Sequence, residues 1–120
     1  MKSRFPEAIA SFSAALAVIL GAMAAHALHD FLEAAKRLDA YHTAALYHLT
    51  HSIGALILAR AGLVKSAWTM LGGVLLFSGS IYLLCLVEGT SFLGPVTPIG
   101  GVLMIVAWIA AGISRFRDAG

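Results

Sequence analysis

The sequence places two pairs of histidines inside or beside apolar runs. His48 and His51 lie three residues apart in YHLTHSIGALILA, and His26 and His29 lie three apart in AAHALHD. An imidazole ring can donate and accept hydrogen bonds, change its charge near neutral pH, and bind zinc, copper, iron or nickel. Because polar groups in apolar surroundings need partners, these rings are the first candidates for a site.

Three interpretations of the histidines remain open. In the first, neutral rings donate to carbonyl or tyrosine oxygens of a neighbouring helix. In the second, His26, His48 and His51 bind a metal or haem, although the sequence offers no thiolate partner, and no carboxylate in the helical turns that carry His48 and His51. In the third, they handle a proton or bind an organic ligand, as ionisable residues at membrane depth commonly do. The first is our main interpretation, and we predict no bound metal or cofactor.

The composition is typical of an integral membrane protein. Of the 120 residues, 60% are hydrophobic and 12% are charged, whereas soluble domains carry about 25% charged residues. The length suits one domain, residues 1–120. The eight Lys and Arg residues fall at the ends of apolar runs, which is the placement of topology signals, so the predicted partner is the lipid bilayer and not nucleic acid.

Four apolar segments predict an all-α fold, an integral membrane bundle of four transmembrane helices. The segments are 8–28, 43–61, 67–87 and 97–113. A helix needs about 20 residues to cross the hydrocarbon, a length that the fourth segment does not reach. Residues 30–41 place apolar and charged side chains on opposite helical faces. This pattern predicts a short amphipathic helix in the first loop, which either lies on the membrane surface or folds over the mouth of the bundle.

The charged residues predict the orientation of the chain. Positive charges cluster at the N-terminus, in the second loop and in the C-terminal tail (Lys2, Arg4, Arg60, Lys65, Arg115 and Arg117). The positive-inside rule then places both termini in the cytoplasm of a multi-pass protein of the inner (cell) membrane. A rival interpretation takes the first segment as a signal peptide cleaved at AMA before Ala25, which would leave three helices. The length of the apolar run favours a span.

Four motifs, in order along the chain, resemble those of a known family. LGAMAAHAL, AYHTAALYHLTHSIGALIL, LLFSGSIYLL and TPIGG are similar to motifs of the small membrane proteins grouped as domain of unknown function 423, which include the eukaryotic transmembrane protein 256. The resemblance covers about residues 12–108. It implies a four-helix inner-membrane protein and supplies no activity.

The resemblance also selects individual residues. Those that match the motifs are Gly21, His26, Thr43, Tyr47, His51, Ser78, Gly79, Ser80, Tyr82, Thr97, Pro98 and Gly100. Ala24 stands where the family is expected to have glycine, and His42 and His48 stand where it more often has Glu and Gln. The resemblance therefore implies a paired polar contact between the first two membrane helices, made by His26 and His51.

Two functions remain open at this point. The candidate ligand-binding or helix-contact residues are His26, Tyr47, His48, His51, Ser78, Ser80 and Tyr82. The main hypothesis is a non-enzymatic binding, accessory or oligomeric membrane component, acting as a homo-oligomer or in a larger membrane complex, because the loops are short and small residues let helices pack closely. The alternative is a protein that handles a small molecule, ion, proton, metal or haem at an outer-leaflet site around His26 and His51. We expect no enzymatic activity, since the sequence shows no nucleophile constellation, phosphate loop or carboxylate pair.

Overall fold

Residues 4–119 fold into four long helical rods. The computed structural model describes residues 4–119, and Lys2 lies outside this range. The elements are α1 (Arg4–Ala25), α2 (His29–Ala34), α3 (Leu38–Arg60), α4 (Val64–Val74), the π-helical segment η1 (Leu75–Gly79), α5 (Ser80–Leu86), the 3₁₀ segment η2 (Ser91–Leu93) and α6 (Val96–Ala119). The segments α4, η1 and α5 are continuous and are called the α4–α5 rod below.

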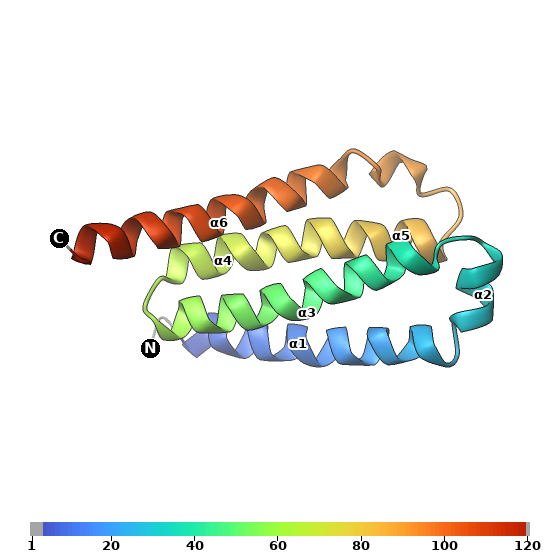
Figure 1. The fold of residues 1–120 in the computed structure, drawn as a ribbon, viewed down its shortest axis with the longest axis horizontal. Helices are drawn as coiled ribbons and strands as arrows, with labels where there is room; N and C mark the ends of the chain where they lie inside the picture. The colour runs from blue at the N-terminus through green and yellow to red at the C-terminus, as the bar shows by residue number, and fades with distance from the viewer. Residues whose placement is uncertain (1–3, 120) are drawn as a thin grey trace.

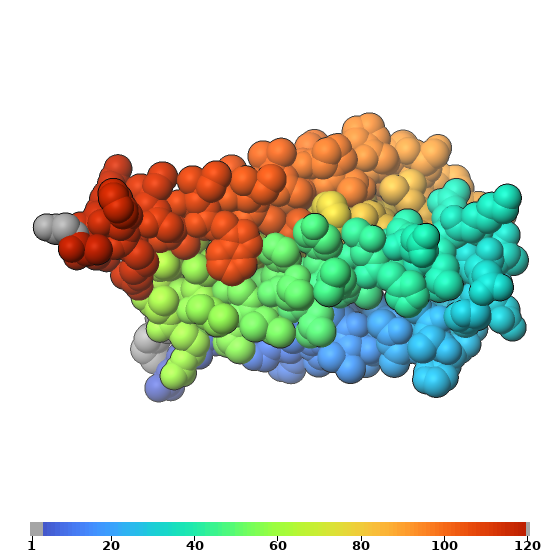
Figure 2. All heavy atoms as spheres, in the orientation of Figure 1, coloured from blue at the N-terminus to red at the C-terminus, as the bar shows by residue number. Residues whose placement is uncertain are grey.

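The rods lie side by side in the order α1, α3, α4–α5 rod, α6 (Figure 1). Both ends of the described chain lie at one end of the molecule, whereas α2 and η2 lie at the other. The face shown in Figure 2 is formed mainly by α1, α3 and α6, with little of the α4–α5 rod at its surface. The prediction of an all-α fold is confirmed, because the described residues contain helices and no strand.

Three of the four rods, and not all four, are both long and apolar enough to cross a membrane. They are Arg4–Ala25, Val64–Leu86 and Ser91–Ala119. The predicted count of four apolar spans is wrong by this measure, because α3 does not qualify. Its 23 residues are enough in length, but its histidines, tyrosines and hydroxyl side chains dilute its apolar residues. The structure places this polar helix between α1 and the α4–α5 rod.

The predicted amphipathic helix over 30–41 is interrupted. Lys36 has a φ of 58°, a left-handed conformation that a right-handed helix cannot contain in its interior, so α2 ends at Ala34 and α3 begins at Leu38. Leu32 of α2 and Tyr41 of α3 are fully buried. The segment therefore folds over the end of the bundle with Leu32 and Tyr41 turned inward, whereas Phe31 is exposed.

Close backbone approach holds α6 against the α4–α5 rod. A Cβ atom built on Gly100 would lie 2.2 Å from the amide nitrogen of Phe77 and 2.7 Å from the carbonyl oxygen of Gly73. A Cβ atom on Gly73 would lie 2.7 Å from the side chain of Met104. Only glycine leaves room for these contacts. The buried side chains around them, which include Met70, Met104 and several alanines, form the larger of two apolar clusters.

Candidate functional site

A π-helical turn in the α4–α5 rod shapes the candidate site. The turn η1 spans Leu75–Gly79, and single π turns inside α-helices occur frequently at functional sites. Ser78 is buried in this turn and donates a hydrogen bond of 2.8 Å to the carbonyl oxygen of Ala44 in α3. Four residues later, Tyr82 also faces α3. The π turn thus directs two hydroxyl side chains toward the most polar helix of the bundle.

Four side chains from three rods form a continuous hydrogen-bonded network, called the His48 network below. His48 Nδ1 lies 2.8 Å from the hydroxyl of Tyr82, and His48 Nε2 lies 3.1 Å from the hydroxyl of Ser13 in α1. The Ser13 hydroxyl lies 2.6 Å from that of Ser52 in α3. His48 and Ser52 are 5% and 0% exposed. Because a buried imidazole needs partners for both nitrogens, this arrangement explains how α3 carries a histidine into the bundle interior.

The His48 network lies beside a cavity of about 570 Å³ between α1 and the α4–α5 rod. This cavity, the α1–α4 groove, is walled by apolar side chains and carries a small polar region. Its lining is Ile9, Phe12, Ser13, Leu16, Leu20, His48, Trp68, Leu71, Gly72, Val74, Leu75, Ser78, Gly79 and Tyr82. Phe12 and Leu75 at its rim are 73% and 70% exposed. The groove therefore opens sideways, and its volume lies within the usual range of small-molecule sites.

The structure does not bring His26 and His51 together. His26 is exposed in the turn after α1, whereas Ser52, next to His51, lies opposite Ser13 of α1. Ala25, at the end of α1, comes twelve positions after Ser13 (25 − 13), which is about 18 Å along the helix at 1.5 Å per residue. The polar contacts between α1 and α3 include His48, one turn before the histidine that the resemblance selects, Ser52, and Tyr41, whose hydroxyl donates to the carbonyl oxygen of Leu20.

His51, Tyr47 and Ser80 lie apart from the groove. The His51 ring stacks on Tyr47, with centroids 5.3 Å apart, and meets the edge of Trp108 at 6.0 Å. Its Nδ1 atom lies 3.1 Å from the Tyr47 carbonyl oxygen. The Ser80 hydroxyl pairs with that of Thr97 in α6 at 2.5 Å. Of the seven predicted residues, the groove is lined by His48, Ser78 and Tyr82.

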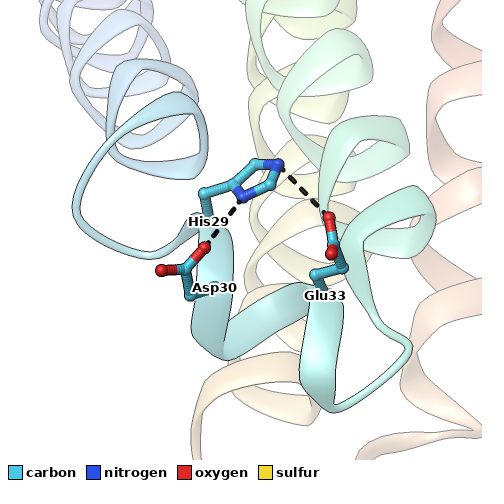
Figure 3. A network of polar contacts seen from close by, with 3 residues as sticks. All are labelled: His29, Asp30 and Glu33. Carbon is cyan, nitrogen blue, oxygen red and sulfur yellow. Dashed lines mark hydrogen bonds and ion pairs between the residues drawn. The ribbon is translucent and has the colours of Figure 1, made fainter.

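A second polar cluster lies at the loop end of the molecule (Figure 3). His29 stands between two carboxylates, with Nδ1 3.3 Å from Asp30 and Nε2 3.5 Å from Glu33. Asp30 and Glu33 are exposed, and exposed ion pairs contribute about 0–1 kcal/mol. Within residues 4–119, no three His, Cys, Asp or Glu side chains are grouped as a metal ion would need, so the metal candidates His26, His48 and His51 are not gathered into one centre.

Sequence reasoning missed Ser13 and Ser52. Isolated serines in apolar helices commonly bond to their own backbone, and nothing in either segment distinguishes these two from such residues. The available signal was the spacing of polar side chains in α3, where His48 and Ser52 are four residues apart and therefore share a face. That face meets α1, and Ser13 is the hydroxyl residue of α1 opposite it.

Comparison with known proteins gives a consistent family. Residues 20–101 match the profile described as "Protein of unknown function (DUF423)". The UPF0382 membrane protein YwdK of Bacillus subtilis is 39% identical over 117 residues, covering 91% of this chain and 94% of the relative. A UPF0382 membrane protein of Haemophilus influenzae is 36% identical over 126 residues, covering 98% of each chain. One of Schizosaccharomyces pombe is 37% identical over 108 residues, covering 83% of this chain and 92% of the relative. No solved structure matches the chain significantly.

Proposed function

The chain belongs to the DUF423 family of membrane proteins, and we propose that it is a non-enzymatic protein that binds a lipid-like molecule in the α1–α4 groove. The observation that carries this proposal is the composition of the groove, which combines apolar walls with one polar region at His48 and Tyr82. Small-molecule sites commonly combine apolar walls with a few placed polar groups. An amphiphile with an apolar body and a single polar group is complementary to this surface.

The placement of Ser13 favours binding over catalysis. Its contact with His48 resembles a serine activated by a base. However, Ser13 lies well inside α1, where backbone N–H groups are engaged with carbonyl oxygens four residues earlier. No backbone N–H group is then free beside Ser13 to stabilise an oxyanion. Such stabilisation usually contributes a large part of the rate enhancement in acyl transfer. This placement supports a groove that holds a ligand over one that cleaves it.

We further propose that α3 crosses the membrane as a fourth span. Its two most polar interior side chains, His48 and Ser52, are buried and hydrogen-bonded to neighbouring rods. Polar residues are tolerated at membrane depth when they face the bundle interior and are paired. With four crossings, both termini lie on one side. The positive-inside rule assigns that side to the cytoplasm of the inner membrane, since Arg60 and Lys65 flank the turn between α3 and α4 and Arg115 near the end of α6 bonds to the Ala61 carbonyl oxygen in that turn.

Cysteine labelling distinguishes four crossings from three. We expect Ser91→Cys to react with a membrane-impermeant maleimide added outside intact cells, and Ala61→Cys and Ala119→Cys to react only after permeabilisation. All three positions are exposed, and the native Cys85 is buried, so the unmodified chain measures the background. If α3 did not cross, the pattern would be reversed, with Ala61→Cys and Ala119→Cys labelled from outside.

Filling the groove tests the binding proposal. Gly72 lines the groove and has no atom within 4 Å of a built Cβ, so Gly72→Leu occupies the cavity without a clash at its base. We expect this variant to reduce cross-linking of a diazirine-bearing fatty acid methyl ester to the groove by about tenfold, which corresponds to about 1.4 kcal/mol of lost contact. The measurement is mass-spectrometric mapping of the adducts on protein in phosphatidylcholine vesicles.

Gly112→Leu is the matched control for this experiment. Gly112 is an exposed helical glycine of α6 that likewise has nothing within 4 Å of a built Cβ, and it lies outside the groove. This variant should cross-link like the unmodified chain. Equal adduct yields in the two variants would count against the groove as a lipid site. Adducts joining two copies through groove residues would support the oligomeric alternative in its place.

A further inference from the structure

The His48 network contains more hydrogen-bond donors than it can use. Ser52, Ser13 and Tyr82 each carry one hydroxyl hydrogen, and a neutral His48 carries one ring hydrogen, which makes four donors. Three contacts join the four groups, and each contact uses one hydrogen. Within residues 4–119 these side chains have no further hydrogen-bond partner. One hydrogen is therefore left without an acceptor.

The tautomer of His48 decides where this hydrogen lies. If the ring hydrogen is on Nδ1, it is donated to Tyr82, Nε2 accepts from Ser13, and the Tyr82 hydrogen is left over. If the ring hydrogen is on Nε2, Tyr82 donates to Nδ1, and the hydrogen left over belongs to one of the two serines. Ser52 is 0% exposed, so a hydroxyl hydrogen stranded there would carry the full cost of an unmade buried hydrogen bond.

The choice between Ser13 and Tyr82 follows from the direction of the bonds. With the hydrogen left on Ser13, that hydroxyl accepts from both Ser52 and His48, and its own hydrogen has no partner. With the hydrogen left on Tyr82, the bonds run in one direction, from Ser52 to Ser13 to His48 to Tyr82. Hydrogen bonds aligned head to tail polarise and strengthen one another. The second arrangement is favoured, and its free donor lies in the lining of the groove.

Building on the proposed function, we infer that the Tyr82 hydroxyl donates to the ligand and that the ligand is a neutral lipid with a carbonyl oxygen, of ester, ketone or quinone type. A free donor selects a polar group that accepts a hydrogen bond. A carboxylate or phosphate also accepts, but no Lys or Arg lines the groove, and an unpaired charge is costly in such surroundings. A carbonyl oxygen satisfies Tyr82 without bringing a charge into the groove.

Competition between two matched probes tests this inference. One probe is the diazirine-bearing fatty acid methyl ester, and the other is a diazirine-bearing hydrocarbon of the same length without the carbonyl. The unmodified chain should favour the ester at the groove by about threefold to tenfold, the effect of one hydrogen bond between neutral groups. Tyr82→Phe should remove this preference, and Gly112→Leu should keep it, because Gly112 lies outside both the groove and the His48 network.

The tautomer provides a readout that does not depend on a ligand. In protein labelled with ¹⁵N-histidine, with His48 assigned by its absence in His48→Gln, we expect the ring hydrogen on Nδ1. Two results would overturn the assignment to Tyr82 while leaving lipid binding intact. One is a ring hydrogen on Nε2. The other is an ester preference that survives in Tyr82→Phe but is lost in Ser13→Ala. No preference for the ester in the unmodified chain would overturn the carbonyl ligand. If neither probe labels the groove, the proposed function itself fails, whatever the tautomer.

Discussion

Gly100→Ala is expected to lower the free energy of unfolding by about 3 kcal/mol, the upper part of the usual range for overpacking. The added methyl would lie 2.2 Å from the Phe77 amide nitrogen and 2.7 Å from the Gly73 carbonyl oxygen. These neighbours are backbone atoms, so no side chain can turn aside to make room. The helix α6 would have to move away from the α4–α5 rod, and the contacts of Met104 with that rod would loosen with it.

The measurement is equilibrium unfolding in mixed micelles of dodecyl maltoside and sodium dodecyl sulphate, followed by circular dichroism. Gly112→Ala is the matched control, because it makes the same change in the same helix at a position with nothing within 4 Å of the built Cβ. Alanine forms helices better than glycine, so this control should be unchanged or slightly more stable. Equal stability of the two variants would show that α6 is not held by backbone contact at Gly100.

His48→Ala is expected to cost about 2 kcal/mol of unfolding free energy, from the volume it leaves empty and the two hydrogen bonds that it loses. His48 is 5% exposed and joins α1 to the α4–α5 rod through Ser13 and Tyr82. Without the ring, this polar bridge between the two sides of the groove is lost. The same unfolding assay measures the loss, and probe cross-linking to the groove should fall with it.

His26→Ala is the informative comparison for His48→Ala. His26 is exposed in the turn after α1, so its removal should change the unfolding free energy by less than about 0.5 kcal/mol, as is usual for surface substitutions. The family resemblance selects His26 and not His48, and the structure favours the opposite order. If His26→Ala proved the more damaging of the two, the network described around His48 would not be what joins α1 to its neighbours.

The long apolar runs of the sequence predict three of the four rods well, because each of these three is dominated by aliphatic residues. The predicted segments 8–28, 67–87 and 97–113 correspond to α1, the α4–α5 rod and α6, which runs six residues further than predicted (119 − 113). The break at Lys36 could not be predicted, since a lysine carries no signal for a positive φ. It depends instead on the burial of Leu32 over the end of the bundle.

The partners of the candidate residues could not be predicted from spacing within a segment. Spacing places His48 and His51 on one helix, but which of them faces α1 depends on the rotation of α3 against its neighbours. The π turn η1 adds to this difficulty, because it changes the direction in which Ser78 and Tyr82 point relative to Gly73. Three of the seven candidate residues line the groove, and the unpredicted Ser13 lines it with them.

The sideways opening of the groove determines what a ligand must compete with. Phe12 and Leu75 form an exposed apolar rim on two of the helices suited to span a membrane, so any molecule that enters arrives by exchange with the surrounding acyl chains. The acyl chains of the bilayer surround the groove as water surrounds a soluble site. They pack against its apolar walls as favourably as the apolar part of a ligand does. The preference of the groove for a ligand over acyl chains is a difference between two affinities. It depends on the Tyr82 hydroxyl, because the hydrocarbon of an acyl chain offers this donor no hydrogen-bond acceptor. The selectivity of the groove between ligands and its affinity for an apolar tail are therefore separate properties. The polar side chains determine the selectivity, and they do not determine the affinity for the tail.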